Sequence, residues 1–184
     1  MTLTAHLQGT CEACGKTFQR FSSFQRVCRT PRCANRIVKA DKQREAQETR
    51  ARRLALKPRA KWIAEAQAAV NAYVRARDQG KPCISCSTPW HESFQAGHYL
   101  TRGARPELRF HLDNIHGQCI QCNLHLHGNQ AMARIGILAR IGLERVEALE
   151  GPRPLEKFPV DELRCIRDGY RAMTKQLLED RDVL

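Results

Sequence analysis

Two pairs of cysteines constrain this chain more than any other feature of its sequence. Cys83 and Cys86 form one C-x-x-C pair, and Cys119 and Cys122 form another about thirty residues later. This spacing is typical of a structural zinc site in which four thiolates surround one Zn²⁺ ion. Such an ion joins the two ends of a segment without a large hydrophobic core. The sequence therefore predicts a metal-bound hairpin over residues 83–122.

A second group of four cysteines lies near the N-terminus, with the spacing C-x2-C-x13-C-x4-C. Its members are Cys11, Cys14, Cys28 and Cys33. Gly15 directly follows the first pair and suits the tight turn of a zinc knuckle. We expect two structural Zn²⁺ ions, each closed to water by four thiolates; the alternative for this group is free cytosolic thiols. Three phenylalanines could cover the small metal core, namely Phe18, Phe21 and Phe24.

The charge of the chain is strongly basic and unevenly distributed. The formal net charge is +12, and the segment Lys16–Arg59 holds 14 basic residues against three acidic ones. A concentrated basic segment favours a polyanionic partner, foremost nucleic acid, over the alternative of a solvated helix without a ligand. The candidate DNA-binding residues are Arg36, Lys39, Lys42, Arg44, Arg50, Arg52 and Arg53.

The nine cysteines do not form the pattern of a secreted disulfide framework. Residues Met1–Gln8 lack the apolar stretch of a signal peptide. No apolar run approaches the roughly twenty residues that a membrane span needs. We therefore expect a cytoplasmic protein with reduced thiols and no membrane partner.

The pattern of apolar residues predicts an α+β fold that is mostly helical. We expect helices over 34–56, 60–79 and 129–150, a last helix that Asp161 caps, and strands over 94–100 and 108–116. The predicted regions are a zinc knuckle (1–35), a basic helical arm with a linker helix (36–80), a metal-bound core (81–130) and a C-terminal helical region (131–184).

The last helix carries an apolar stripe at alternating spacings of three and four residues. Its members are Leu163, Ile166, Tyr170, Met173 and Leu177. The stripe favours packing within the chain over a dimer seam, and a homodimer is the alternative.

Polar residues of catalytic type fall inside the metal-bound core in a fixed order. His98 follows Cys86 by twelve residues, Asn114 precedes Cys119 by five, and Asn123 directly follows Cys122. This arrangement resembles the HNH (ββα-metal) nucleases, in the His-Asn-Asn variant. The resemblance implies that His98 is the general base, that Asn114 orients it or fixes the loop, and that Asn123 holds a divalent ion. The alternatives are a polar surface residue or a core hydrogen-bond donor for His98, a turn cap for Asn114 and a helix N-cap for Asn123.

One position departs from the HNH pattern. Many such nucleases carry an acidic metal ligand immediately before the base, and this chain has Gly97 there. His116 is a candidate replacement, because it lies two residues from Asn114 and would share its side of a strand. The remaining candidates to hold the ion are His125 and His127, of which His127 would share a helical face with Asn123.

The resemblance extends beyond these residues. Segments 82–86, 96–99, 106–110, 114–116, 118–119, 122–123, His125 and 128–129, with the N-terminal knuckle and basic helix, resemble the NinG (Rap) recombination endonucleases of lambda-like phages. That resemblance implies a structure-specific endonuclease that cleaves branched DNA, Holliday junctions and D-loops, with Mg²⁺ or Mn²⁺. It places the protein in the cytoplasm of a bacterial host, encoded by a phage or prophage. It also ranks His125 above His127.

Two other functions stay open at this point. The chain could be a zinc-stabilised nucleic-acid-binding protein whose HNH core has decayed, and Gly97 favours this alternative. It could also be a site-specific nuclease of the restriction or homing kind.

Overall fold

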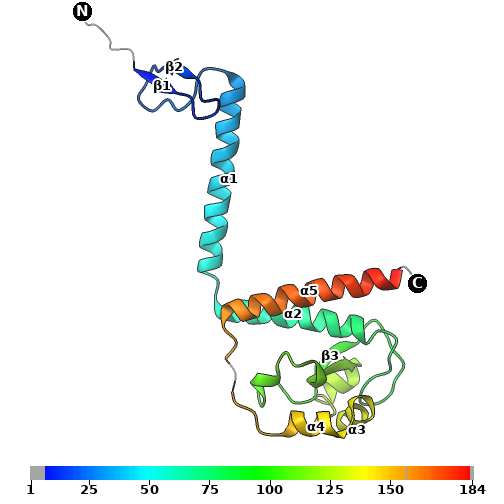
Figure 1. Ribbon diagram of the computed structural model, residues 1–184. Helices are drawn as coiled ribbons and strands as arrows, with labels where there is room; N and C mark the ends of the chain where they lie inside the picture. The colour runs from blue at the N-terminus through cyan, green and yellow to red at the C-terminus, as the bar shows by residue number, and fades with distance from the viewer. Residues whose placement is uncertain (1–6, 156, 183–184) are drawn as a thin grey trace, which may run out of the picture. The chain divides into compact units, whose positions relative to one another are not determined.

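The computed structural model describes residues 7–155 and 157–182. The first residues of the predicted knuckle, and with them most of the Met1–Gln8 segment, lie outside that range. The chain forms two compact units, Met1–Lys57 and Pro58–Leu184, and more than half of it is helical (Figure 1). The boundary divides the predicted region 36–80, because its two helices belong to different units.

The first unit is a small hairpin followed by one long helix. Strands β1 (Gln8–Thr10) and β2 (Thr17–Gln19) pair antiparallel, and α1 covers Pro31–Ala55. Pro31 begins the helix, where its missing N–H costs no hydrogen bond. Among the described residues, α1 buries Cys33 and no apolar stripe, as its polar composition predicts.

The second unit is built on two long helices, α2 (Arg59–Arg77) and α5 (Val160–Asp182), which lie side by side (Figure 1). Trp62, Ala66, Val70 and Val74 recur every four residues and form one buried face of α2. Phe158 and residues of α5 complete this core.

The apolar stripe of α5 packs against α2. Leu163 is fully buried, and Ile166 and Tyr170 are partly buried against the core. The ring centroids of Tyr73 and Tyr170 are 5.3 Å apart. This part of the stripe is therefore not free to form a dimer seam. Asp161 lies inside the first turn of the helix, so the expectation that it is the cap is wrong.

Strands β3 (Gln95–His98) and β4 (Ile115–Gln118) form the second antiparallel hairpin, with His98 opposite Ile115. The predicted strand over 108–116 is wrong in extent. Only Ile115 and His116 of that stretch belong to a strand, and the residues before them lie in two 3-10 turns, η1 (Pro106–Leu108) and η2 (Leu112–Asn114), and in the turn that joins these. Side chains satisfy backbone carbonyls here: Asn114 donates to Leu108 and Arg77 donates to Leu112, so no strand ladder is needed.

The chain after β4 forms a π-helical turn, η3 (Gln121–His125), and then α3 (Gln130–Ile141) and α4 (Leu143–Glu150). The single helix predicted over 129–150 is wrong. Gly142 has φ 84° and separates the two helices, a conformation that glycine adopts without steric cost. The break lets Ile137 of α3 and Val146 of α4 enter one core cluster.

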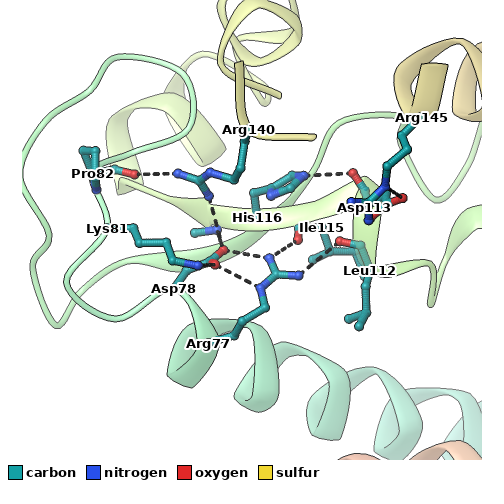
Figure 2. A network of polar contacts seen from close by, with 11 residues as sticks. Arg77, Asp78, Lys81, Pro82, Leu112, Asp113, Ile115, His116, Arg140 and Arg145 are labelled. Atoms are coloured by element: carbon teal, nitrogen blue, oxygen red, sulfur yellow. Dashed lines mark hydrogen bonds and ion pairs between the residues drawn. The ribbon is translucent and has the colours of Figure 1, made fainter. Parts of the chain in front are cut away.

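A buried carboxylate joins the end of α2 to the hairpin (Figure 2). Asp78 accepts hydrogen bonds of 2.8 Å from the Gly117 N–H and 2.8–2.9 Å from Arg77, with Lys81 at 3.3 Å and Arg140 at 3.6 Å. Burial opposes ionisation, but Arg77, the Gly117 N–H and Arg140 outweigh it and lower the pKa of Asp78 to about 2.

The arginines around Asp78 extend this network to backbone carbonyls. Arg77 donates to Ile115 at 2.8 Å and to Leu112 at 3.3 Å, and Arg140 donates to Pro82 at 3.3 Å. The cluster thus links α2, the start of β4, α3 and the loop that leads into the second cysteine group.

We expect the Asp78→Asn variant to unfold more easily by up to about 3–5 kcal/mol, because it leaves the partly buried guanidinium groups of Arg77 and Arg140 without their counter-charge. The pKa of Asp78 is lowered by folding, so its contribution is present above about pH 4 and is lost as the pH falls toward 2. Urea unfolding of both proteins at pH 7 and pH 3 measures this. Equal midpoints at pH 7 would contradict it, and Asp161→Asn, at an exposed side chain, is the matched control.

Candidate functional site

Each predicted cysteine group is brought together in the structure. In both groups the four Sγ atoms lie within 4.8 Å of one another, and all nine cysteines of the chain are free thiols. A tetrahedral Zn²⁺ with four thiolates places sulfur atoms about 3.8 Å apart, given Zn–S bonds of about 2.3 Å. Both groups could therefore hold zinc with small adjustments.

The second group connects three separate segments of the larger unit. Cys83 and Cys86 lie in the loop after α2, Cys119 directly follows β4, and Cys122 lies in η3. Cys86 Sγ and Cys119 Sγ are 3.7 Å apart, close to one edge of a zinc tetrahedron. Backbone N–H groups donate to sulfur, from Cys119 to Cys83 and from Cys122 to Cys119, both at 3.4 Å. Such donors stabilise thiolates and fit a metal-bound state.

The first group joins the β1–β2 turn to the start of α1. The Cys11 N–H donates to the Lys16 carbonyl at 2.8 Å, and Gly15, at φ 72°, closes the turn. Phe18 packs against this cluster as predicted. The same prediction is wrong for Phe21 and Phe24, which are exposed.

His98 ends β3 and lies between the hairpin and the loop that follows it. Its Nε2 is 3.0 Å from the Arg109 carbonyl oxygen, which can only accept, so Nε2 carries the proton and Nδ1 keeps the lone pair. Burial lowers the pKa of His98 to about 4, and Arg102 and Arg109 act in the same direction. The imidazole is therefore neutral at pH 7 and can accept a proton at Nδ1.

A cavity of about 880 Å³ brings several predicted residues together. His98, Asn123 and His127 all line it, with Arg75 and Arg102 as cations and Glu92 as the carboxylate among its described lining residues. Asn123 lies within the π-helical turn, not at the start of an α-helix as we expected. His127, at φ 48°, lies in the left-handed segment that leads to α3.

Gln95 also lines this cavity and was not predicted from the sequence. Its Oε1 accepts a hydrogen bond of 2.6 Å from Asn123 Nδ2, which fixes the amide and leaves Asn123 Oδ1 as the atom that can bind a cation. Gln95 lies on the same strand as His98, three residues before it. The only signal in the sequence was its place on that strand.

The structure gives a physical reason for Gly97. A Cβ at this position would collide with Gln118 Oε1 and lie 3.0 Å from Asn123 Oδ1. Gln118 cannot easily move, because its Nε2 donates to Ser85 Oγ at 2.7 Å and to the Gly128 carbonyl at 2.6 Å. The glycine is therefore required by the packing of this hairpin.

Asn114 is fully buried and holds the loop after β3. Its Nδ2 donates to the Leu100 and Leu108 carbonyls at 3.0 and 3.2 Å, and its Oδ1 accepts from the Leu100 N–H at 2.8 Å. These bonds position the loop that carries Arg109, the partner of His98. Asn114 is thus placed to fix the loop, one of the two roles that the HNH resemblance implies.

Two other histidines are not brought to the cavity. His116 pairs with Gly97, so it points to the other face of the hairpin from His98, where its Nε2 bonds the Asp113 carbonyl at 2.8 Å (Figure 2). Asn114 lies in a 3-10 turn, so the expected shared strand face does not exist. His125 is exposed and does not line the cavity, whereas His127 does.

The seven candidate DNA-binding residues all lie on α1, but they differ in their partners. Arg36 donates to the Ala13 carbonyl at 2.7 Å, and Arg44 pairs with Asp41 at 2.9 Å. Lys42, Arg50 and Arg53 line one shallow surface of the helix. Lys39 and Arg52 are also exposed.

In the part of the chain that the structure describes, no helix is both long and apolar enough to cross a membrane.

Comparison with known proteins shows the family to which the chain belongs. The family model described as "Bacteriophage Lambda NinG protein" matches residues 4–180. Over 130 residues the chain is 44% identical to Protein ninG of Escherichia phage lambda, 45% to that of Escherichia phage 933W and 43% to that of Salmonella phage P22. These matches cover 71% of this chain and 64–65% of each relative, so the chain spans slightly less than two thirds of the relatives' length. No solved structure matches at a significant level. Because the family model covers nearly the whole sequence, the chain belongs to the NinG family.

Proposed function

We propose that this NinG-family chain is a divalent-metal-dependent endonuclease of the HNH type that cleaves branched DNA intermediates of phage recombination. The observation that carries the proposal is the position of His98, whose Nε2 bonds the Arg109 carbonyl while its ring lines a cavity that Asn123 also lines. Zinc on the second cysteine group, the Asn114 bonds and the Gln95–Asn123 bond would together hold these groups in place. Rigid placement of a base and a metal ligand is what phosphodiester hydrolysis requires.

The polar side chains of the cavity that act on the DNA divide three tasks in this proposal: taking a proton, holding the divalent ion and binding phosphates. His98 Nδ1 takes a proton from the attacking water while its Nε2–H stays bonded to the Arg109 carbonyl. Asn123 Oδ1 and His127 would hold Mg²⁺ or Mn²⁺, which keeps several waters and binds phosphate oxygens directly. When bound, the ion stabilises negative charge on the phosphate and the leaving oxygen. Arg75 and Arg102 line the cavity and are placed to bind flanking phosphates.

The test is cleavage of an end-labelled synthetic four-way junction with Mg²⁺, with Ca²⁺ and without a divalent ion. The proposal expects cuts near the branch point with Mg²⁺ and far slower cutting of a linear duplex of the same sequence. Binding without cutting under every condition would instead support the decayed core. The packing around Gly97 gives a second reason for the glycine, besides loss of a metal ligand through decay. Sequence-dependent cutting of supercoiled plasmid would support a restriction or homing nuclease.

The exposed cations of α1 should carry much of the DNA affinity. Changing Arg50, Arg52 and Arg53 to glutamine should weaken binding to all DNA shapes. The slope of log affinity against log salt should fall by about 0.9 for each phosphate that the variant no longer neutralises. Fluorescence anisotropy between 50 and 200 mM salt, roughly the range over which such binding weakens, measures the slope. The matched control replaces three exposed cations of α5, Arg164, Arg171 and Lys175. Equal slopes for the two triple variants would contradict the assignment.

Resolution of a junction needs two opposed cuts, and two copies of the chain would supply the two active sites. We propose a homodimer on the DNA for this reason, with a surface other than the buried part of the α5 stripe. The site of action would be the cytoplasm of a bacterial host.

A further inference from the structure

The loop between the two halves of the N-terminal cysteine group presents aromatic rings to solvent. Phe21 is 70% exposed and Phe24 is 89% exposed, although both lie within a few residues of Cys28. A small metal-bound module would ordinarily bury such rings against its cysteines, as it does with Phe18. Two exposed rings on one short loop are therefore a feature that the knuckle's own stability does not explain.

Hydrogen bonds within the loop fix this outward arrangement. The Gln25 side chain accepts from the Phe21 N–H at 3.0 Å and donates to the Val27 carbonyl at 2.9 Å, so its amide occupies the inside of the loop. A turn from Ser22 to Gln25 closes at 3.1 Å, and Ser22 Oγ accepts from the Phe24 N–H at 3.3 Å. The Gln25 amide thus joins the two sides of the loop while both phenyl rings stay exposed, on a loop that Cys28 ties to the metal group.

The surroundings of the two rings are basic. Between Gln8 and Cys33 there are five basic residues and one acidic residue, Glu12, which pairs with Arg26. The Arg29 guanidinium carbon lies 4.3 Å from the centroid of the Phe21 ring. A guanidinium over a phenyl ring offers a flat cationic face, and α1 continues the basic surface from Pro31 onward within the same unit.

We propose that Phe21 and Phe24 form a stacking site for unpaired nucleobases, with Arg29 and the start of α1 binding the flanking phosphates. Aromatic rings stack on the faces of all four bases, so such a site reads strand separation and not sequence. Fully paired duplex keeps its base faces covered, whereas single strands expose them, and a branch point exposes the faces of its flanking bases when the protein opens it. This inference rests on the proposed function, and it assigns part of the recognition of branched DNA to the knuckle.

The experiment uses the full-length zinc-loaded protein with Ca²⁺ in place of Mg²⁺, so that DNA is bound but not cut. Fluorescein-labelled four-way junction, single strand and linear duplex of matched length are the probes. Phe24→Ala should lose about tenfold in affinity for junction and single strand and almost nothing for duplex. Phe24→Trp should keep wild-type affinity, whereas Phe24→Leu, which is apolar but has no ring, should behave like the alanine variant. Leu143→Ala, at another exposed apolar side chain, is the control and should change nothing.

A 2-aminopurine base at the branch point gives a second measurement. Wild-type protein should quench it by stacking, and Phe24→Ala should not. Equal loss of affinity for all three DNA shapes would overturn the proposal, as would wild-type binding by Phe24→Ala. A third outcome would overturn the proposal in favour of an apolar interface with a second copy of the chain. In that outcome Phe24→Leu binds DNA as the wild type does, and light scattering shows that Phe24→Ala no longer forms a dimer. These failures differ from failure of the proposed function, in which the wild-type protein would cut no branched DNA with Mg²⁺.

Discussion

Replacing His98 with alanine is expected to slow cleavage of a four-way junction by about 10²- to 10⁴-fold while junction affinity stays the same. The side chain supplies a neutral base, because burial holds its pKa near 4, and its Nε2–H is committed to the Arg109 carbonyl. From a reference pKa of about 6.5, one would expect activity to rise through neutral pH. The lowered pKa moves this rise to more acidic pH, so His98 titration should not limit the rate at pH 7. Single-turnover cleavage measures the chemical step.

Control variants distinguish the loss of the general base from a general loss of folding or of DNA binding. His91→Ala removes an exposed imidazole that does not line the cavity and should cut at the wild-type rate. Asn123→Ala and His127→Ala should weaken the hold on the divalent ion and recover partly at higher Mn²⁺, whereas His98→Ala should not recover. A His98→Ala protein that cuts at the wild-type rate would place the active site elsewhere in the chain.

The metal groups were predictable because their spacing is a local property of the sequence. A C-x-x-C pair places two thiols on one turn, and each group needs only one encounter with a second pair, C-x-x-C or C-x4-C, to complete a tetrahedron. All eight predicted cysteines therefore meet in the two expected groups. The long helices α1, α2 and α5 were predictable for a similar reason, since composition and a period of 3.6 residues extend over five or more turns.

The details around the cavity were not predictable, because they depend on single turns and on which way one side chain points. The sequence before Ile115 has the pattern of a strand, but side chains of Asn114 and Arg77 bond the backbone carbonyls there in place of a neighbouring strand. The left-handed residues at 127–129 decide that His127 lines the cavity in place of His125. The sequence suggests that Phe21 and Phe24 are core residues, but in the structure the Gln25 amide bonds the backbone within their loop and both rings are exposed. Each case depends on a few hydrogen bonds or backbone angles that no sequence pattern announces.

Replacing Cys83 with serine is expected to unfold the second unit without unfolding the first. Cys83 is buried with Phe94 and Cys122 in a cluster that contains few other apolar side chains. Structural zinc contributes about 10–16 kcal/mol in small metal-bound modules, which is comparable to the whole stability of a typical domain, about 5–15 kcal/mol. Loss of one ligand should therefore remove the metal and the hairpin that carries His98. Zinc content should fall from about two ions to about one per chain, with loss of hydrogen-exchange protection confined to residues after Pro58.

The matched changes are Cys165→Ser, at an exposed thiol outside both groups, and Cys11→Ser in the first group. Cys165→Ser should keep both ions and full protection. Cys11→Ser should also lose one ion, but the protection it loses should lie before Lys57, because the two units are separately compact. Cleavage should persist in Cys11→Ser with weaker DNA binding and be abolished in Cys83→Ser. If Cys83→Ser kept two zinc ions and cut junctions normally, the second cysteine group would not be what holds the active site in place.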